Sequence, residues 1–460
     1  MTNFVFYDTE TTGLSREFDQ ILQFAAILTD DTFLELERFE IRCRCLPWVV
    51  PAPMALKVTG VSPAQLKDPA LPSFFDMMST IRHKLAAWSP AVFIGYNSIR
   101  FDEPLLQRAL WQTLHPPYLT VTDGNARMDL LPIVQATSHL ADGALAYPET
   151  DRGNTGFKLD ALAPLNGYAH KNAHDALADV EATIHIAKLI ADRVPTLWLS
   201  SVLRAPKQAT AKVLEKGRPV YVVEYFMGKP AAWWGQRLDA HGSKGTNASI
   251  ARLDQNWEHL ASVNEDELAK ALTSYPKPLR HLGMNKAPIV FTEDEAGSYW
   301  GIELDDQAKA MSAHLNASPD AVRRILEQDA ALQERWPESE HLEQRIFEGF
   351  PSRADEHGML AFQSADWTER ARLMRTFEDN RFSQLAQRIV YVNAPDKLEP
   401  SDRERLEKAI TERLMVDHGD DKLWRTIPAA MRELDSVRAT EGGDNAARQI
   451  EMWLRSIVQE

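Results

Sequence analysis

The chain lacks several features that would define its class at once. It has only two cysteines, Cys43 and Cys45, and their spacing along a strand-like run suits neither a disulfide nor a zinc knuckle. No apolar run approaches the roughly 18 residues of a membrane helix, and the first residues do not follow the pattern of a signal peptide. We therefore expect a soluble protein of the reducing cytoplasm, with no membrane partner.

Positive charge is also in deficit. The chain has 51 lysines and arginines against 66 acidic residues, which gives a net charge of -15. This balance argues against broad, non-specific adhesion to nucleic acid or to anionic membranes. A nucleic-acid partner would therefore need a local basic groove. The length of 460 residues, at 44% hydrophobic content, exceeds what one core usually supports and predicts two or three domains.

The first stretch combines an apolar strand with two acids. Residues 4–7 are apolar or aromatic, and Asp8 and Glu10 follow them. Because side chains alternate along a strand, these two carboxylates should point to the same face. Adjacent carboxylates at the end of a buried strand repel each other and lose hydration, and a divalent cation would offset both costs. From this pair alone, a solvated strand end or turn is an open alternative.

Residues 1 to 192 alternate between strand-like and helix-like segments, which favours an α/β domain. The elements that we predict are strands at 4–7, 21–28, 33–43 and 91–95, and a helix at 73–88. This order of strand, hairpin, helix and strand is compatible with the mixed sheet of a ribonuclease H-like domain.

A third acid, Asp102, follows the predicted strand at 91–95 and precedes Pro104. Proline suits the first turn of a helix, so a helix should begin here. Asp102 would then either cap that helix or contribute to a site, because loops that leave the carboxyl ends of strands carry sites in α/β sheets. Both interpretations are open at this point.

A strongly periodic helix begins near residue 175 and carries Asp179 in its early turns. Asp175 is the expected N-cap, and His174 comes just before it. A histidine at a helix start is usually a capping or surface residue. Its functional interpretation depends on the acids that end other elements of the same α/β unit.

Together these residues resemble the histidine-containing DEDD superfamily of 3′-5′ exonucleases. The order is Asp-x-Glu at a first strand, Asp after a Gly-Tyr-Asn strand end, and His-x4-Asp at a later helix. The five matching residues are Asp8, Glu10, Asp102, His174 and Asp179. The runs at 23–27, 95–103, 172–180 and 281–290 resemble the bacterial exonuclease I family in particular.

The resemblance implies a two-metal site. Mg²⁺, for which Mn²⁺ could substitute, would be bound by Asp8, Glu10, Asp102 and Asp179, since hard carboxylate oxygens are the ligands that these ions prefer. His174 would take a proton from the attacking water, a role that suits a side chain with an ordinary pKa of about 6.5.

Substrate contacts are also implied. Lys158 lies where the family places a basic contact, although an exposed lysine at a helix start is the alternative. The candidate substrate-binding residues are Glu10, Tyr96, Asn97, Arg100 and Lys158.

The composition changes after about residue 195. The segment 203–218 carries five basic residues against one acid, which makes it either a phosphate track or a solvated helix face. Strands are predicted at 219–227, 231–238 and 248–253. The resemblance implies an SH3-like β domain over 195–349, whose aromatic residues either stack on bases or form the core. The aromatic residues in question are Tyr225, Phe226, Trp233 and Trp234.

Residues 351–460 are predicted to be helical. No residue in this range suggests a catalytic role. The resemblance implies a helical C-terminal domain that helps to close a channel over the nuclease site, and a purely structural packing role is the alternative.

The implied function is that of a 3′-5′ exodeoxyribonuclease. It would degrade single-stranded DNA to 5′-mononucleotides in DNA repair and recombination, as a monomer, with single-stranded DNA-binding protein as a partner. Polarity and the preference for DNA rest on the resemblance. The alternatives are an exoribonuclease of the same superfamily and a single-strand-binding scaffold that does not cut.

Overall fold

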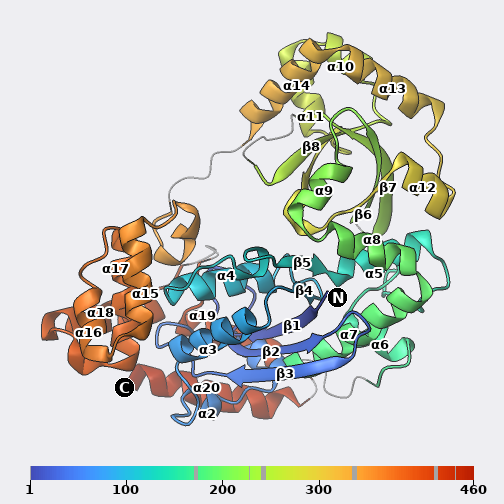
Figure 1. Cartoon of the computed structure of the whole chain (residues 1–460). Coiled ribbons are helices and arrows are strands. Elements are labelled where there is room, and N and C mark those ends of the chain that lie inside the picture. Colours follow the sequence, from blue (N-terminus) through green and yellow to red (C-terminus); the bar gives the residue numbers. More distant parts are fainter. Residues whose placement is uncertain are drawn as a thin grey trace.

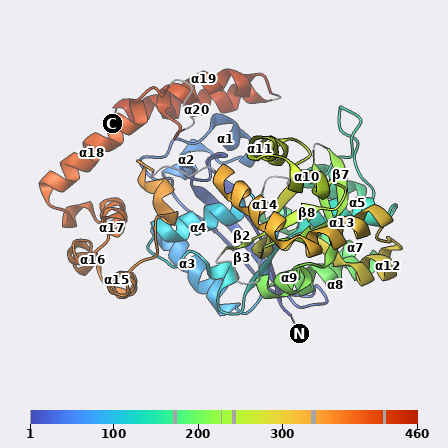
Figure 2. The same ribbon diagram turned by 90° about the horizontal axis from the view of Figure 1, so that it is seen from above.

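The computed structural model describes residues 2–169, 175–226, 228–239, 245–333, 339–418, 423–440 and 442–459. Along the chain an α/β part is followed by a part built on an antiparallel sheet and then by helices (Figure 1). In Figure 1 the second sheet lies above the first part, and the C-terminal helices lie at its left and lower sides. Seen from above, these helices form an arc along one side of the first part (Figure 2).

The first part contains a five-stranded mixed sheet with the order β3-β2-β1-β4-β5. Its strands are β1 (Phe4–Thr11), β2 (Ile21–Thr29), β3 (Glu35–Arg42), β4 (Val92–Gly95) and β5 (Ala126–Asp129). β1 pairs antiparallel with β2 and parallel with β4, and β4 pairs parallel with β5. The predicted α/β fold with a mixed sheet is therefore confirmed, although β5 was not predicted.

Helices cover both faces of this sheet, with α5 and α7 on one face and α3 and α4 on the other. The helical elements from residue 53 to residue 213 are α1 (Pro53–Thr59), α2 (Pro63–Leu66), α3 (Phe74–Ala87), α4 (Asp102–Gln112), η1 (Leu119–Val121), α5 (Leu130–Leu140), α6 (Leu159–Leu165), α7 (Ala176–Arg193), α8 (Pro195–Arg204) and α9 (Lys207–Val213).

The alternation along β1 decides which face each side chain joins. Phe4 and Phe6 pack in one hydrophobic cluster with residues of α5 and α7. Val5 and Tyr7 pack in another cluster, with residues of α3 and α4. Because side chains alternate along a strand, the residues that follow on β1 should continue this pattern, toward α7 and α4 in turn.

The middle part contains a second five-stranded sheet, with the order β10-β6-β7-β8-β9 and only antiparallel pairs. Its strands are β6 (Pro219–Phe226), β7 (Lys229–Arg237), β8 (Asn247–Arg252), β9 (Leu279–Gly283) and β10 (Ile289–Thr292). The other elements are α10 (Trp257–Ser262), α11 (Glu265–Thr273), η2 (Met284–Lys286), α12 (Glu293–Trp300), α13 (Asp306–Ala317) and α14 (Pro319–Leu332).

The first and middle parts share one continuous hydrophobic cluster. Trp234 and Phe291 of the second sheet belong to the same cluster as Phe4 and Phe6 of β1. Trp233 and Trp234 are 4% and 7% exposed, so for these two residues the core interpretation is confirmed over base stacking. This shared core fixes the second sheet against the first part.

The C-terminal part is helical, as predicted. Its elements are η3 (Leu342–Phe347), α15 (Arg353–Ser364), α16 (Trp367–Leu373), α17 (Asn380–Asn393), η4 (Pro395–Lys397), α18 (Pro400–Met415), α19 (Ile427–Arg438) and α20 (Gly443–Gln459). Leu342 and Ile346 pack with the C-terminal helices, although they precede residue 351. The domain limits 1–192, 195–349 and 351–460 stay a prediction.

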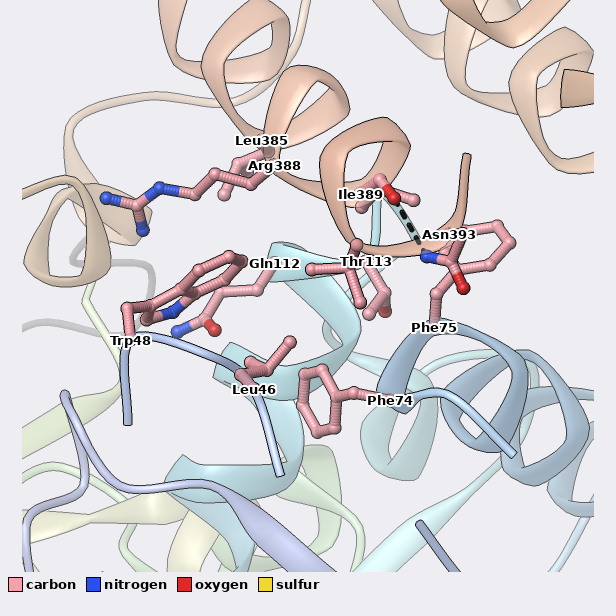
Figure 3. Close-up of a pocket in the computed structure, with 11 residues that line it drawn as sticks. Leu46, Trp48, Phe74, Phe75, Gln112, Thr113, Leu385, Arg388, Ile389 and Asn393 are labelled. Carbon is pink, nitrogen blue, oxygen red and sulfur yellow. Dashed lines mark hydrogen bonds between the residues drawn. The ribbon is translucent and has the colours of Figure 1, made fainter. Parts of the chain in front are cut away.

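Helix α17 packs on the first part across the seam shown in Figure 3. Leu385, Arg388 and Ile389 face Trp48 and Phe74 there, and the Arg388 guanidinium lies 5.4 Å from the centre of the Trp48 ring. The cavity between them has a volume of about 30 Å³. A ligand site usually has some 300 Å³ or more, so this seam is an interface between helices and sheet domain and not a substrate pocket.

A charged centre lies beside this seam. The Glu343 carboxylate accepts bonds from Arg388 at 2.8 Å and from Arg413 at 2.9 Å. Burial alone would raise the pKa of Glu343, but the two guanidinium groups hold it below its usual value.

None of the helices in the described ranges is long and apolar enough to cross a membrane.

Candidate active site

Three acids from β1 and α7 converge. Asp8 and Glu10 lie two residues apart on β1, and Asp179 lies in the first turn of α7. One carboxylate oxygen from each lies within 4.8 Å of the others, so the three could share a metal ion. The expected common face of Asp8 and Glu10 is therefore observed, and it is the face that packs on α7.

Helix α7 is fixed at its start by Asp175. The Asp175 side chain accepts a hydrogen bond from the Ala178 N–H, which confirms its prediction as N-cap. The same carboxylate accepts a bond of 2.8 Å from Arg42 on β3 and one of 3.2 Å from Gln23 on β2. These bonds tie the beginning of α7 to the sheet and so position Asp179 opposite Glu10.

The acids strongly perturb one another. Burial, followed by the charges of Asp102, Asp179 and Glu10, raises the pKa of Asp8 well above its usual range. Burial and the charges of Asp179 and Asp102 raise the pKa of Glu10 to about 8, although Arg42 opposes this shift. Converging oxygen donors that repel one another fit a divalent cation, which would add positive charge to that of Arg42.

Asp102 approaches β1 from its other face. The N-cap of α4 is Phe101 and Asp102 is the first helical residue, so the N-cap interpretation of Asp102 is wrong. Its carboxylate instead accepts a 2.5 Å hydrogen bond from the hydroxyl of Thr9, the residue between Asp8 and Glu10. Burial raises the pKa of Asp102 to about 7 although this hydrogen bond lowers it. Its role as a metal ligand stays a prediction.

His174 lies outside the described residues, so its role as the base also stays a prediction. The structure does describe Asp175 and the helix that follow it.

Asp129 is a buried acid beside the candidate site that the sequence reasoning missed. It ends β5, and its carboxylate accepts bonds from the N–H groups of Asn97 at 2.8 Å and Ile99 at 3.1 Å. These bonds hold the loop between β4 and α4, in which Asn97 has a positive φ of 61°. Burial raises the pKa of Asp129 to about 6 despite its backbone hydrogen bonds. Its position at a strand end was the available signal, but β5 itself was not predicted.

Glu103 was also missed. It is 1% exposed and follows Asp102 directly. It accepts hydrogen bonds from the Tyr7 hydroxyl at 2.8 Å and from the Thr120 hydroxyl. It also forms an ion pair of 2.7 Å with Arg127 of β5. Tyr7 directly precedes Asp8, and Glu103 directly follows Asp102. These bonds therefore fix β1 and α4 next to the candidate metal ligands Asp8 and Asp102.

The predicted substrate contacts line different parts of this region. Asn97 and Arg100 are exposed in the loop before α4, and Tyr96 is half-buried with its hydroxyl donating to the Phe157 carbonyl. Lys158 is exposed at the N-cap position of α6, which is the place that the alternative interpretation gave it. Their roles as DNA contacts stay predictions.

The basic segment 203–218 is only partly available to a ligand. Arg204 is 5% exposed and pairs with Glu295 at 2.5 Å, and Arg218 pairs with Glu215 at 3.2 Å. Lys212 and Lys216 are exposed on the surface. A phosphate track in this segment would therefore exclude Arg204.

The aromatic pair predicted at the end of β6 is divided between two environments. The Tyr225 ring lies 4.7 Å from that of Phe157 and joins the middle part to the first part. Phe226 is 38% exposed and stacks at 4.9 Å on Tyr275, which is 60% exposed. Only the second pair presents an aromatic surface to solvent.

Comparison with known proteins explains this arrangement. Residues 5–187 match the exonuclease family model, and residues 340–457 match the model of the exonuclease I C-terminal domain. The chain is a homologue of exonuclease I over most of its length. Exodeoxyribonuclease I of Haemophilus influenzae is 28% identical over 410 residues, which are 83% of this chain and 84% of that protein. Exodeoxyribonuclease I of Escherichia coli is 26% identical over 427 residues, or 88% of each chain.

The exonuclease I family also supplies a matching fold. The zinc-bound crystal structure of the Escherichia coli exonuclease I complex with single-stranded DNA has a TM-score of 0.85 and 22% sequence identity, and all of both chains is covered. At this identity the similarity establishes the fold. The curated relatives extend the sequence similarity over most of the chain.

The raised pKa values predict a pH dependence of stability. Glu10 and Asp102 bind protons more tightly when folded than when unfolded, so without divalent cations the free energy of unfolding should fall between about pH 4.5 and pH 8. We expect a loss of roughly 1–3 kcal/mol, since one pKa unit corresponds to about 1.4 kcal/mol before solvent screening. Denaturant titrations in EDTA across this range measure it.

The matched variant is Glu10→Gln, which should flatten this pH dependence, while Asp160→Asn on the exposed first turn of α6 should leave it unchanged. Addition of Mg²⁺ at pH 8 should restore stability to the unmodified protein. Stability that rises from pH 4.5 to pH 8 in EDTA would contradict the mutual repulsion of these acids.

Proposed function

We propose that this chain is a 3′-5′ exodeoxyribonuclease that degrades single-stranded DNA to 5′-mononucleotides. The observation that carries the proposal is the convergence of Asp8, Glu10 and Asp179 within 4.8 Å, with Asp102 against the same strand, in a homologue of exonuclease I. The relatives named exodeoxyribonuclease I cover most of the chain, and a solved homologue is bound to single-stranded DNA.

The acids would bind two Mg²⁺ ions, with Mn²⁺ as a substitute. Asp8 would contact both ions, and Glu10, Asp102 and Asp179 would complete their ligand sets. When bound, such ions polarise the scissile phosphate and stabilise charge on the attacking and leaving oxygens. The donor set supports this assignment, because all four groups are oxygen donors of the kind that hard cations prefer.

The remaining chemistry belongs to the protein's own groups. His174 would accept a proton from the attacking water, and in the sequence it directly precedes Asp175, the N-cap of α7. The hydrogen bond from Thr9 holds Asp102 in place, and the bonds to Asp129 fix the loop that carries Asn97 and Arg100. Lys158, Tyr96, Asn97 and Arg100 would contact the DNA.

The biological setting is proposed on the same family relationship. The protein would act in the cytoplasm as a monomer, in DNA repair and recombination, with single-stranded DNA-binding protein as its partner. An exposed basic surface such as Lys212 and Lys216 would suit an acidic segment of that partner.

A nuclease assay on end-labelled substrates tests the proposal. Single-stranded DNA labelled at its 5′ end should be shortened progressively in Mg²⁺, DNA labelled at its 3′ end should release labelled mononucleotide at once, and EDTA should stop both reactions. Single-stranded RNA of the same sequence should be a poor substrate. Preferred degradation of RNA would favour an exoribonuclease, and binding without degradation would favour a scaffold.

A second experiment tests the proposed base. His174→Ala should lower kcat by about 100-fold or more, the usual scale for general base catalysis, and leave the affinity for DNA within about twofold. Single-turnover rates and anisotropy titrations measure the two quantities. His83→Ala, on the exposed face of α3, is the matched control. Near-normal turnover by His174→Ala would remove this assignment.

A further inference from the structure

The short turn η2 brings a lysine from the middle part to the nuclease part. Lys286 ends this turn, which follows β9 directly. It belongs to the run at 281–290, which lies outside residues 5–187 that match the exonuclease model and to which the proposed mechanism gives no role. The contacts around it show what this run does.

The turn is anchored on the catalytic framework. The Arg127 guanidinium donates a 3.0 Å bond to the Asn285 carbonyl, and it also donates a 2.7 Å bond to Glu103. Arg127 is 7% exposed and Glu103 is 1% exposed, so the connection is shielded from water. One buried ion pair therefore positions both the start of α4 and the residue next to Lys286.

The Lys286 side chain is held in a defined place. A Cβ built at Gly283 would lie 2.9 Å from the Cδ and 3.0 Å from the Cγ of Lys286, so the lysine stem lies across the bare glycine backbone. Lys286 as a whole is nevertheless exposed. The absence of a side chain at Gly283 thus leaves room for the stem of Lys286.

The charges of several other cations act on this ammonium group. Loss of surrounding water, together with the charges of Arg127, Arg100 and Arg16, lowers the pKa of Lys286. Arg127 is already paired with Glu103, whereas Arg16 and Arg100 are exposed. Arg16 follows the end of β1, and Arg100 lies two residues before Asp102. Like charges gathered from three segments repel one another unless an anion lies between them.

We propose that Lys286 is a substrate-binding residue that contacts the phosphate backbone of single-stranded DNA next to the cleavage site, together with Arg100 and Arg16. The middle part would in this way contribute directly to the active site through the turn η2. Arg127 binds this turn at the Asn285 carbonyl and also binds Glu103, the residue after Asp102. The inference rests on the proposed function, because it assumes that the ligand is a single-stranded nucleic acid.

The salt dependence of binding tests this inference. The dissociation constant of a fluorescent 16-nucleotide oligothymidylate is measured by anisotropy in EDTA, over a range of NaCl concentrations, for the full-length protein. Removal of one phosphate contact from a single strand should reduce the slope of log Kd against log salt by about 0.7. We expect this change in Lys286→Met, with binding weakened about tenfold at low salt, and recovery of the slope in Lys286→Arg.

Two controls separate a phosphate contact from a structural effect. Lys309 is on α13, the helix at the outer end of the middle part in Figure 1. The variant Lys309→Met should keep the salt slope of the unmodified protein. The double variant Lys286→Met with Arg100→Met should lose less affinity than the sum of the two single losses if both residues bind one phosphate region.

The outcomes distinguish this inference from the proposed function. If the unmodified protein degrades single-stranded DNA but Lys286→Met keeps its salt slope, the inference is overturned and the proposed function is not. An unmodified protein that neither binds nor degrades single-stranded DNA would overturn both.

Discussion

The repulsion between carboxylates on and around β1 is the constraint on which the rest of the structure depends. Asp8 and Glu10 face Asp179 of α7 on one side of the strand, and Asp102 meets Thr9 on the other side. Burial makes each of these charges costly and raises the pKa values of the β1 acids. Such a cluster persists only if packing elsewhere holds the strand and both helices in place, and it gains most when a cation is bound.

The support comes from both sides of the sheet. The residues before the acids on β1 alternate between two hydrophobic clusters, one reaching α7 and the other reaching α4. Polar contacts then fix the ends of the elements: Asp175 ties α7 to Arg42, and Glu103 ties α4 to Arg127. Since Arg127 also holds the Asn285 carbonyl, the framework of the nuclease site extends into the middle part. The middle part is thus joined to the nuclease site by the buried Arg127 guanidinium as well as by the shared hydrophobic core.

Some of the site could be predicted because it depends on local rules. The period of a strand put Asp8 and Glu10 on one face, and helix-capping chemistry identified Asp175. The contact between Thr9 and Asp102 depends on how α4 packs on the sheet, so the local pattern suggested a cap instead. β5 has only four residues, which alternate between apolar and charged side chains although all four are buried, so this short run did not stand out as a buried strand. Asp129 and Arg127 were missed with it, and the roles of the acids came from family resemblance.

The central claim is that the acids of β1 bind the divalent cation, and calorimetric titration tests it most directly. Mn²⁺ is titrated into the unmodified protein, into Asp8→Ala and into Asp160→Ala, whose altered residue is exposed on α6. The account predicts that Asp8→Ala binds Mn²⁺ at least about tenfold more weakly, since even the loss of an outer-shell partner of a metal ligand typically costs 10 to 100-fold. Asp160→Ala should bind like the unmodified protein. Unchanged Mn²⁺ affinity in a folded Asp8→Ala protein would contradict the account.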